Sequence, residues 1–309
     1  MAERYTDTPY NFTEIVPYII TDVSIVGRKI ILAKKCYFYD TCSFRNHMRI
    51  SDAGLIFKYI KDTGGIVVLT RTVLMELCSG DGRLWEEHVE YIRNLYLAGI
   101  TVLVIYEEDL FEVLHTYCSD AVLINQWLSY AVKNAKSKVG SIEQAIGQDL
   151  KLKKALLESR ECKDSKLAER VFQAARRKKE PEDNLGEEML AICVHWLSHM
   201  RESAAYKYII FSDDKKAMGT FAKVIRNARE YLGQDMISVF TTPKLCYQMK
   251  VHGVLEVKEQ VINILSSGNT GDMIKTFCSE EFELSPAEKI MSIDMFAEKV
   301  ITENVKIYY

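Results

Sequence analysis

Short apolar segments rich in β-branched and aromatic residues recur along the chain, and each is followed by sequence with helical spacing. Five of these segments predict strands at residues 35–40, 66–69, 100–106, 208–211 and 236–240. Helical patterns follow the first two segments at residues 51–61 and 73–78. Strands that are apolar on both faces and alternate with helices are typical of a parallel sheet covered on both sides. The pattern therefore predicts an α/β fold with a central parallel sheet.

Two regions depart from this alternation. Residues 111–182 show helical periodicity and no strand, and residues 151–180 contain 11 Lys and Arg against 5 Asp and Glu, a net charge of +6. Residues 253–309 contain 5 Lys and Arg against 10 Asp and Glu, a net charge of −5. The latter stretch predicts two or three helices, interrupted at residues 266–272 and restarting at Ser285-Pro286. We therefore expect an N-terminal extension (1–33) packed on a core domain (34–252) with a basic helical insertion (about 111–182), then an acidic helical C-terminal extension (253–309).

The overall composition is that of a packed globular protein. The chain has 309 residues, 48% of them hydrophobic, and a formal net charge of −3, which excludes a strongly basic nucleic-acid coat protein. No run of about 18 apolar residues occurs, and the N-terminus lacks a basic-then-apolar secretory pattern, so we expect a cytoplasmic protein without a membrane span. The 8 cysteines form no CxxC pair, which predicts reduced thiols rather than a zinc site or disulfides.

Acidic residues gather near the ends of the predicted strands. Asp40 ends the first strand, and Glu76 lies on the helix after the second. A later helix opens with the acidic residues Asp183, Glu187 and Glu188. Two more, Asp213 and Asp214, follow the fourth strand. Ligands of open parallel sheets bind outside the carboxyl ends of the strands, so we expect these side chains to converge.

Converging carboxylates repel one another unless protons or cations neutralise them. One or two Mg²⁺ or Mn²⁺ ions, which prefer oxygen ligands, are the simplest solution. Such ions activate water and stabilise the oxygens of a phosphate under attack, which predicts phosphodiester hydrolysis. Each acid also has a local structural explanation: Asp40 and Asp213 as helix N-caps, residues 183–188 as partners of a helix dipole, and Glu76 as an exposed helical residue.

Five sequence motifs appear in the order expected of one nuclease family. They read YFYDTCSF (37–44), VLTRTVLMELCS (68–79), NLGEEMLAICVHW (184–196), YIIFSDDKKAM (208–218) and ISVFTTPKLCYQM (237–249). Over residues 34–250 the chain thus resembles the PIN domain family of metal-dependent nucleases. The resemblance implies a three-layer α/β/α sandwich acting on single-stranded RNA or structured DNA, and the gap of 107 residues between Glu76 and Asp183 implies a large insertion.

The resemblance also implies roles for particular residues. The catalytic metal ligands would be Asp40, Glu76, either Glu187 or Glu188, and Asp213, with Asp183 and Asp214 as further candidates. Thr41 and Ser212 would orient ligands or water around the metal. No covalent nucleophile is implied.

The basic insertion offers a surface for RNA phosphates. Its candidate contacts are Lys151, Lys153, Lys154, Arg160, Lys163, Lys166, Arg170, Arg176, Arg177, Lys178 and Lys179. Binding through them would be salt-dependent because counterions are released. The alternative is a solvated helix face with no ligand.

The leading prediction is a Mg²⁺- or Mn²⁺-dependent endoribonuclease, with a toxin, defence or RNA-processing role left open. The alternatives are a non-catalytic PIN-like scaffold that binds RNA or protein, and a structure-specific DNA nuclease. A phosphatase of the haloacid type is disfavoured because Cys42 stands where its D-x-D motif needs a second aspartate. A second copy of the chain and a regulatory protein remain open as partners.

Overall fold

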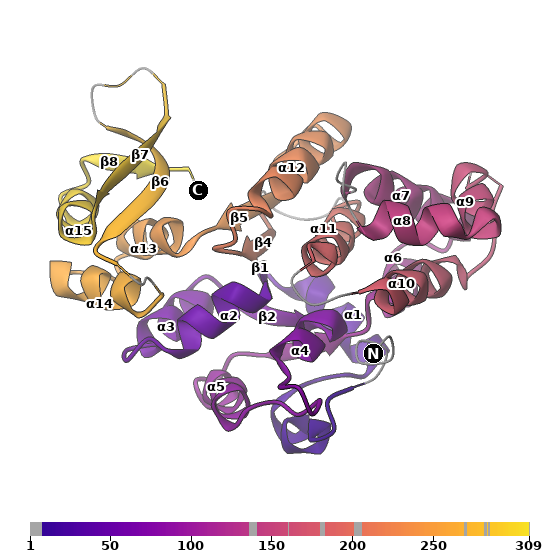
Figure 1. The fold of residues 1–309 in the computed structure, drawn as a ribbon, viewed down its shortest axis with the longest axis horizontal. Helices are drawn as coiled ribbons and strands as arrows, with labels where there is room; N and C mark the ends of the chain where they lie inside the picture. Colours follow the sequence, from indigo (N-terminus) through magenta and orange to yellow (C-terminus); the bar gives the residue numbers. More distant parts are fainter. Residues whose placement is uncertain are drawn as a thin grey trace.

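A computed structural model describes residues 8–135, 141–159, 161–179, 183–200, 206–268, 271–280, 283 and 285–308. Its centre is a five-stranded parallel sheet with the strand order β3-β2-β1-β4-β5 (Figure 1). The strands are β1 (Lys35–Tyr39), β2 (Gly65–Thr70), β3 (Val102–Ile105), β4 (Tyr208–Phe211) and β5 (Ile237–Phe240). All five predicted strands are present, and each boundary lies within two residues of the prediction.

The strand order reverses at β1, which pairs with β2 on one side and with β4 on the other. The chain runs outward from β1 to β3 and then crosses back to β4. Such a reversal opens a crevice at the carboxyl ends of the two strands that flank it. Asp40 directly follows β1 and Ser212 directly follows β4, so both residues lie at this crevice.

Helices cover both faces of the sheet. Neighbouring residues of β1 point to opposite faces: Cys36 and Phe38 join one hydrophobic cluster, and Tyr37 and Tyr39 join the other. The first face is covered by α1 (Val23–Leu32), α6 (Leu110–Tyr117), α11 (Leu185–Leu197) and α12 (Met218–Leu232), and α7 (Ala121–Ala135) packs on α11 and α12. The second is covered by α2 (Thr41–Met48), α3 (Gly54–Asp62), α4 (Arg71–Leu77), α5 (Glu86–Leu97) and α13 (Thr242–Val251). This α/β arrangement is compatible with a three-layer sandwich.

Between β3 and β4, every element that the structure describes is helical, as predicted. A 3₁₀ turn (η3, Glu107–Asp109) precedes α6 and α7, and the remaining helices before α11 are α8 (Ser141–Gln148), α9 (Leu150–Leu157) and α10 (Leu167–Lys178). Leu152, Leu156, Val171 and Phe172 join the same hydrophobic cluster as α11. The insertion is therefore packed onto the core domain.

The predicted all-helical C-terminal extension is wrong. Helix α14 (Lys258–Gly268) is followed by β6 (Met273–Glu280), β7 (Ala287–Ser292), α15 (Ile293–Ile301) and β8 (Val305–Ile307), and the strands form an antiparallel sheet ordered β7-β6-β8. Buried Ile274, Thr276 and Cys278 alternate with more exposed neighbours along β6, which is the period of a strand. Ser285-Pro286 precedes β7 and does not start a helix.

The N-terminal segment packs against β3 at the edge of the sheet. Its elements before α1 are two 3₁₀ turns, η1 (Phe12–Glu14) and η2 (Val16–Tyr18). The Ile20 N–H donates to the Val102 carbonyl (2.9 Å), and the Ile20 carbonyl accepts from the Val104 N–H (3.0 Å). Figure 1 places α8 and α9 and the C-terminal sheet at opposite ends of the molecule. Among the described helices, none is long and apolar enough to span a membrane.

Candidate metal centre

Asp40 lies in the crevice between β1 and β4, where β1 ends and α2 begins, and only 3% of its surface is exposed. Its carboxylate accepts hydrogen bonds from the Thr41 N–H (2.7 Å) and the Ser212 hydroxyl (2.8 Å). Burial, followed by the negative charge of Glu76, raises the pKa of Asp40 to about 7. The site therefore penalises the charged carboxylate, which a nearby cation would stabilise.

Glu76 reaches the same crevice from α4. The Thr41 hydroxyl donates a hydrogen bond to Glu76 Oε2. Thr41 thus joins two acids, because its N–H binds Asp40 while its hydroxyl binds Glu76. These contacts place Thr41 next to the acidic side chains, where the sequence predicts it.

The two consecutive glutamates of α11 point in different directions. Glu187 faces Asp40, Glu76 and Asp214: burial and then these charges raise its pKa to about 8. Its Oε2 is buried without a hydrogen-bond partner among the described residues. Glu188 is fully buried elsewhere and accepts a hydrogen bond from the Ile142 N–H of α8 (3.1 Å). The structure therefore places Glu187 with the other acids and Glu188 against the insertion.

Gly186 allows α11 to approach Glu76 closely. A Cβ atom at this position would lie 2.9 Å from Glu76 Cδ and closer still to Oε1. Contacts shorter than 3.0 Å force the neighbour to move. Only glycine leaves the Glu76 carboxylate in its observed place.

The two aspartates after β4 also differ in their surroundings. Asp213 accepts hydrogen bonds from the N–H and hydroxyl of Thr242 (2.6 and 2.7 Å), the Ser43 hydroxyl (2.9 Å) and Asn46 Nδ2 (3.2 Å). Its carboxylate is therefore engaged in tying β4 to α2 and α13. The charge of Asp214, by contrast, helps to raise the pKa of Glu187. From these charge effects we define the acidic cluster as Asp40, Glu76, Glu187 and Asp214, and the metal-ligand role of Asp213 stays a prediction.

Ser212 connects β4 to the acidic cluster. Its hydroxyl donates to Asp40 Oδ2 and accepts a hydrogen bond from the Asp214 N–H (3.3 Å). Ser212 therefore contacts one carboxylate and the backbone of another acidic residue, and its role beside a metal stays a prediction.

Lys179 lies within the candidate site and not on the surface. Its Nζ lies 2.9 Å from Glu76 Oε1 and 2.6 Å from Asp183 Oδ1, and its side chain is 2% exposed. Asp183 also accepts a hydrogen bond from the Leu185 N–H (3.0 Å) at the start of α11. Asp183 is therefore already neutralised by a lysine, which sets it apart from Glu187.

The predicted RNA-binding surface of the insertion divides into two groups. Arg176 is 1% exposed and binds Glu107 (2.8 Å) and Glu108 (2.8 Å), so its predicted role in phosphate binding is wrong, as is that of buried Lys179. Exposed positions are Lys151, Lys153, Lys154, Lys163, Lys166, Arg170, Arg177 and Lys178, whereas Arg160 lies outside the described residues. Arg170 pairs with Asp164.

The donor chemistry of the acidic cluster fits a hard divalent cation, because all its side-chain donors are carboxylate oxygens. The buried Glu187 Oε2 without a partner is an oxygen that such an ion would satisfy. In the described conformation, no group of three or more His, Cys, Asp and Glu side chains is arranged to hold a metal ion. Lys179 supplies the positive charge beside Glu76 instead. Ion binding thus requires side-chain rearrangement in the cluster.

The sequence prediction missed the roles of Gly186 and Lys179. One signal was present: Arg176 and Lys179 are three residues apart and extend the apolar face formed by Ala168, Phe172 and Ala175. Helical residues at this spacing share a face, so both side chains were candidates for burial. Arg177 and Lys178 fall on the opposite, solvated face.

Comparisons with protein-family models, with curated proteins and with solved structures find no significant match to this chain.

Proposed function

We propose that the protein is a Mg²⁺- or Mn²⁺-dependent nuclease that hydrolyses phosphodiester bonds, with single-stranded RNA as the substrate. The observation that carries this proposal is the Glu187 carboxylate, which is buried beside Asp40 and Glu76 with one oxygen unsatisfied. Carboxylates that repel one another at the crevice of a parallel sheet are neutralised by protons or by cations, and a divalent ion would supply that positive charge. RNA as the substrate follows from the resemblance of the motifs to the PIN family.

In this proposal Asp40, Glu187 and Asp214 hold the ion together with Glu76. A bound divalent ion supplies an activated water and positive charge for the phosphate oxygens. Thr41 and Ser212 keep the carboxylates of Asp40 and Glu76 oriented through hydroxyl hydrogen bonds. Water oxygen attacks phosphorus, the phosphorus–oxygen ester bond breaks, and the water proton leaves with the departing oxygen or to a carboxylate.

One observation favours a second candidate, a non-catalytic scaffold that binds nucleic acid. Lys179 already neutralises Glu76 and Asp183, so the described conformation leaves fewer free carboxylates than the predicted ligand set. In this alternative the lysine replaces the metal permanently and the acids are structural.

The test is cleavage of labelled single-stranded RNA and DNA in the presence of Mn²⁺. We expect the wild type to cleave RNA and Asp40→Asn to lose at least about 100-fold in rate, because one charged ligand is removed. Asp22→Asn is the matched control, since Asp22 also begins a helix but lies on the surface at α1. Cleavage of DNA alone would identify a DNA nuclease. Inert wild-type protein, or equal rates for wild type and Asp40→Asn, would support the scaffold.

A further inference from the structure

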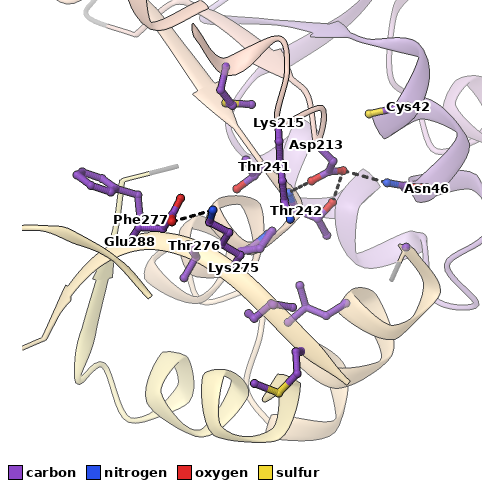
Figure 2. A pocket seen from close by; sticks show the side chains of 16 residues that line it. Cys42, Asn46, Asp213, Lys215, Thr241, Thr242, Lys275, Thr276, Phe277 and Glu288 are labelled. Atoms are coloured by element: carbon purple, nitrogen blue, oxygen red, sulfur yellow. Dashed lines mark hydrogen bonds and ion pairs between the residues drawn. The ribbon is translucent and has the colours of Figure 1, made fainter. Parts of the chain in front are cut away.

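A cleft separates the carboxyl edge of the parallel sheet from the C-terminal antiparallel sheet. Its cavity volume is about 470 Å³, within the range of small-ligand sites. One wall comes from α2, the loop after β4 and the start of α13, and the other from β6 and β7. Figure 2 shows Asp213 and Lys215 on the first wall and Lys275, Phe277 and Glu288 on the second.

The cleft leads to the acidic cluster. Cys42 lines it, two residues after Asp40 of the cluster. Asp213 lines it too, one residue before Asp214 of the cluster. A chain lying in the cleft would therefore pass Cys42 and Asp213, which adjoin members of the cluster along the chain.

The side chains of the cleft suit a phosphate-bearing strand. Lys215 is exposed and forms no ion pair with any described residue. Lys275 pairs with Glu288 (2.7 Å), and the two side chains are 39% and 60% exposed, so the pair contributes little and a phosphate can compete with Glu288 for the ammonium. Phe277 adds an aromatic ring of the kind on which bases stack, and Met273 adds apolar surface.

We propose that this cleft binds single-stranded nucleic acid, with Lys215 and Lys275 contacting phosphates on its two walls. The inference rests on the proposed function, because it assigns the cleft as the substrate path to the acidic cluster. The cleft is separate from the exposed basic residues of the insertion, because Figure 1 places α9 far from β6 and β7.

Fluorescence anisotropy with a labelled 12-nucleotide oligouridine in EDTA tests the inference without catalysis. We expect the double variant Lys215→Ala/Lys275→Ala to raise Kd at least tenfold. It should also reduce the slope of log K against log salt by about 0.7 for each lost phosphate contact. Lys29→Ala/Lys58→Ala removes the same charge from exposed positions of α1 and α3 and should leave Kd unchanged. A third variant, Lys151→Ala/Lys153→Ala/Lys154→Ala, tests whether the lysines of α9 bind the oligonucleotide.

Three results would overturn the proposal that the cleft binds nucleic acid. They are no binding by the wild type, equal Kd for the wild type and the Lys215→Ala/Lys275→Ala variant, or loss of binding confined to the α9 variant. These outcomes are separable from the nuclease proposal. If the cleft variant binds more weakly but the wild type does not cleave, the cleft binds nucleic acid and the nuclease proposal is wrong. If the wild type cleaves and the cleft variant binds as tightly as the wild type, the nuclease proposal holds and the cleft proposal is wrong.

Discussion

Lys179 Nζ lies 2.9 Å from Glu76 Oε1, so a buried lysine supplies positive charge to an acid of the candidate metal centre. The same ammonium binds Asp183 at 2.6 Å. A cation held by the chain itself therefore neutralises one side of the acidic cluster. Glu187, on the other side, has no such partner among the described residues.

Replacing Lys179 should make stability depend on a divalent ion. Lys179→Met leaves the partly buried Glu76 and Asp183 without their counterion, which costs up to about 3–5 kcal/mol in free energy of unfolding. Added Mn²⁺ should recover part of that loss by binding the carboxylates that have lost the lysine. Denaturant unfolding with and without Mn²⁺ measures both effects. Lys178→Met, at the exposed neighbouring position, is the control; equal effects of the two variants would rule out a special role for Lys179.

Gly186→Ala should displace the Glu76 carboxylate, because the added Cβ would lie 2.9 Å from Glu76 Cδ. We expect Mn²⁺ affinity to fall about 10–100-fold, as when the orientation of a ligand is lost. Gly219→Ala is the matched control: it is likewise the second residue of a helix and has open space around it. Calorimetric titration of the two variants with Mn²⁺ measures this difference. An unchanged Mn²⁺ affinity for Gly186→Ala would show that the observed position of Glu76 is not needed for metal binding.

The metal-free protein should lose stability as pH rises. In the folded chain the pKa of Asp40 is raised from 3.8 to about 7 and that of Glu187 from 4.5 to about 8. Between these values the folded state binds more protons than the unfolded state, so the free energy of unfolding falls with increasing pH. We expect Tm in EDTA to drop between about pH 5 and pH 8, by about 2–4 °C for each kcal/mol lost. Glu187→Gln should flatten the profile, and an equally steep profile in that variant would exclude Glu187 as a cause.

Arg176→Ala should destabilise the fold and not merely weaken RNA binding. Arg176 is buried with Glu107 and also pairs with the partly exposed Glu108, and Glu107 accepts a hydrogen bond from the Thr72 N–H (2.8 Å). Removing one member of a buried ion pair costs about 3–5 kcal/mol. Arg177→Ala, at the adjacent exposed position, should change stability by less than about 0.5 kcal/mol. Urea unfolding of both variants checks this contrast, and equal stabilities would mean that the buried pair contributes nothing.

The sequence predicts the central sheet well because its strands are buried on both faces. Such strands form continuous apolar runs, of which Lys35–Tyr39 and Tyr208–Phe211 are clear examples. The C-terminal sheet is harder to predict, since buried Thr276 and exposed Met273 obscure the alternation along β6. A polar residue inside and an apolar one outside weaken the period on which the prediction depends.

The candidate site is predictable in part for a similar reason. The positions of Asp40 and Glu76 in the site can be predicted, because both lie just after strands whose ends are visible in the sequence. The choice between Glu187 and Glu188 depends on how α11 is rotated against α8, and the choice between Asp213 and Asp214 depends on the path of one loop. These are tertiary relationships, so sequence spacing leaves both pairs open.

Direct measurement of Mn²⁺ binding tests the central claim, that the acidic cluster holds a divalent cation. Isothermal titration at pH 8 should show binding to the wild type and at least tenfold weaker binding to Glu187→Gln. Glu188→Gln, which changes the adjacent glutamate that faces α8, should bind like the wild type. Absence of binding to the wild type at millimolar Mn²⁺, or equal affinity in wild type and Glu187→Gln, would contradict the claim.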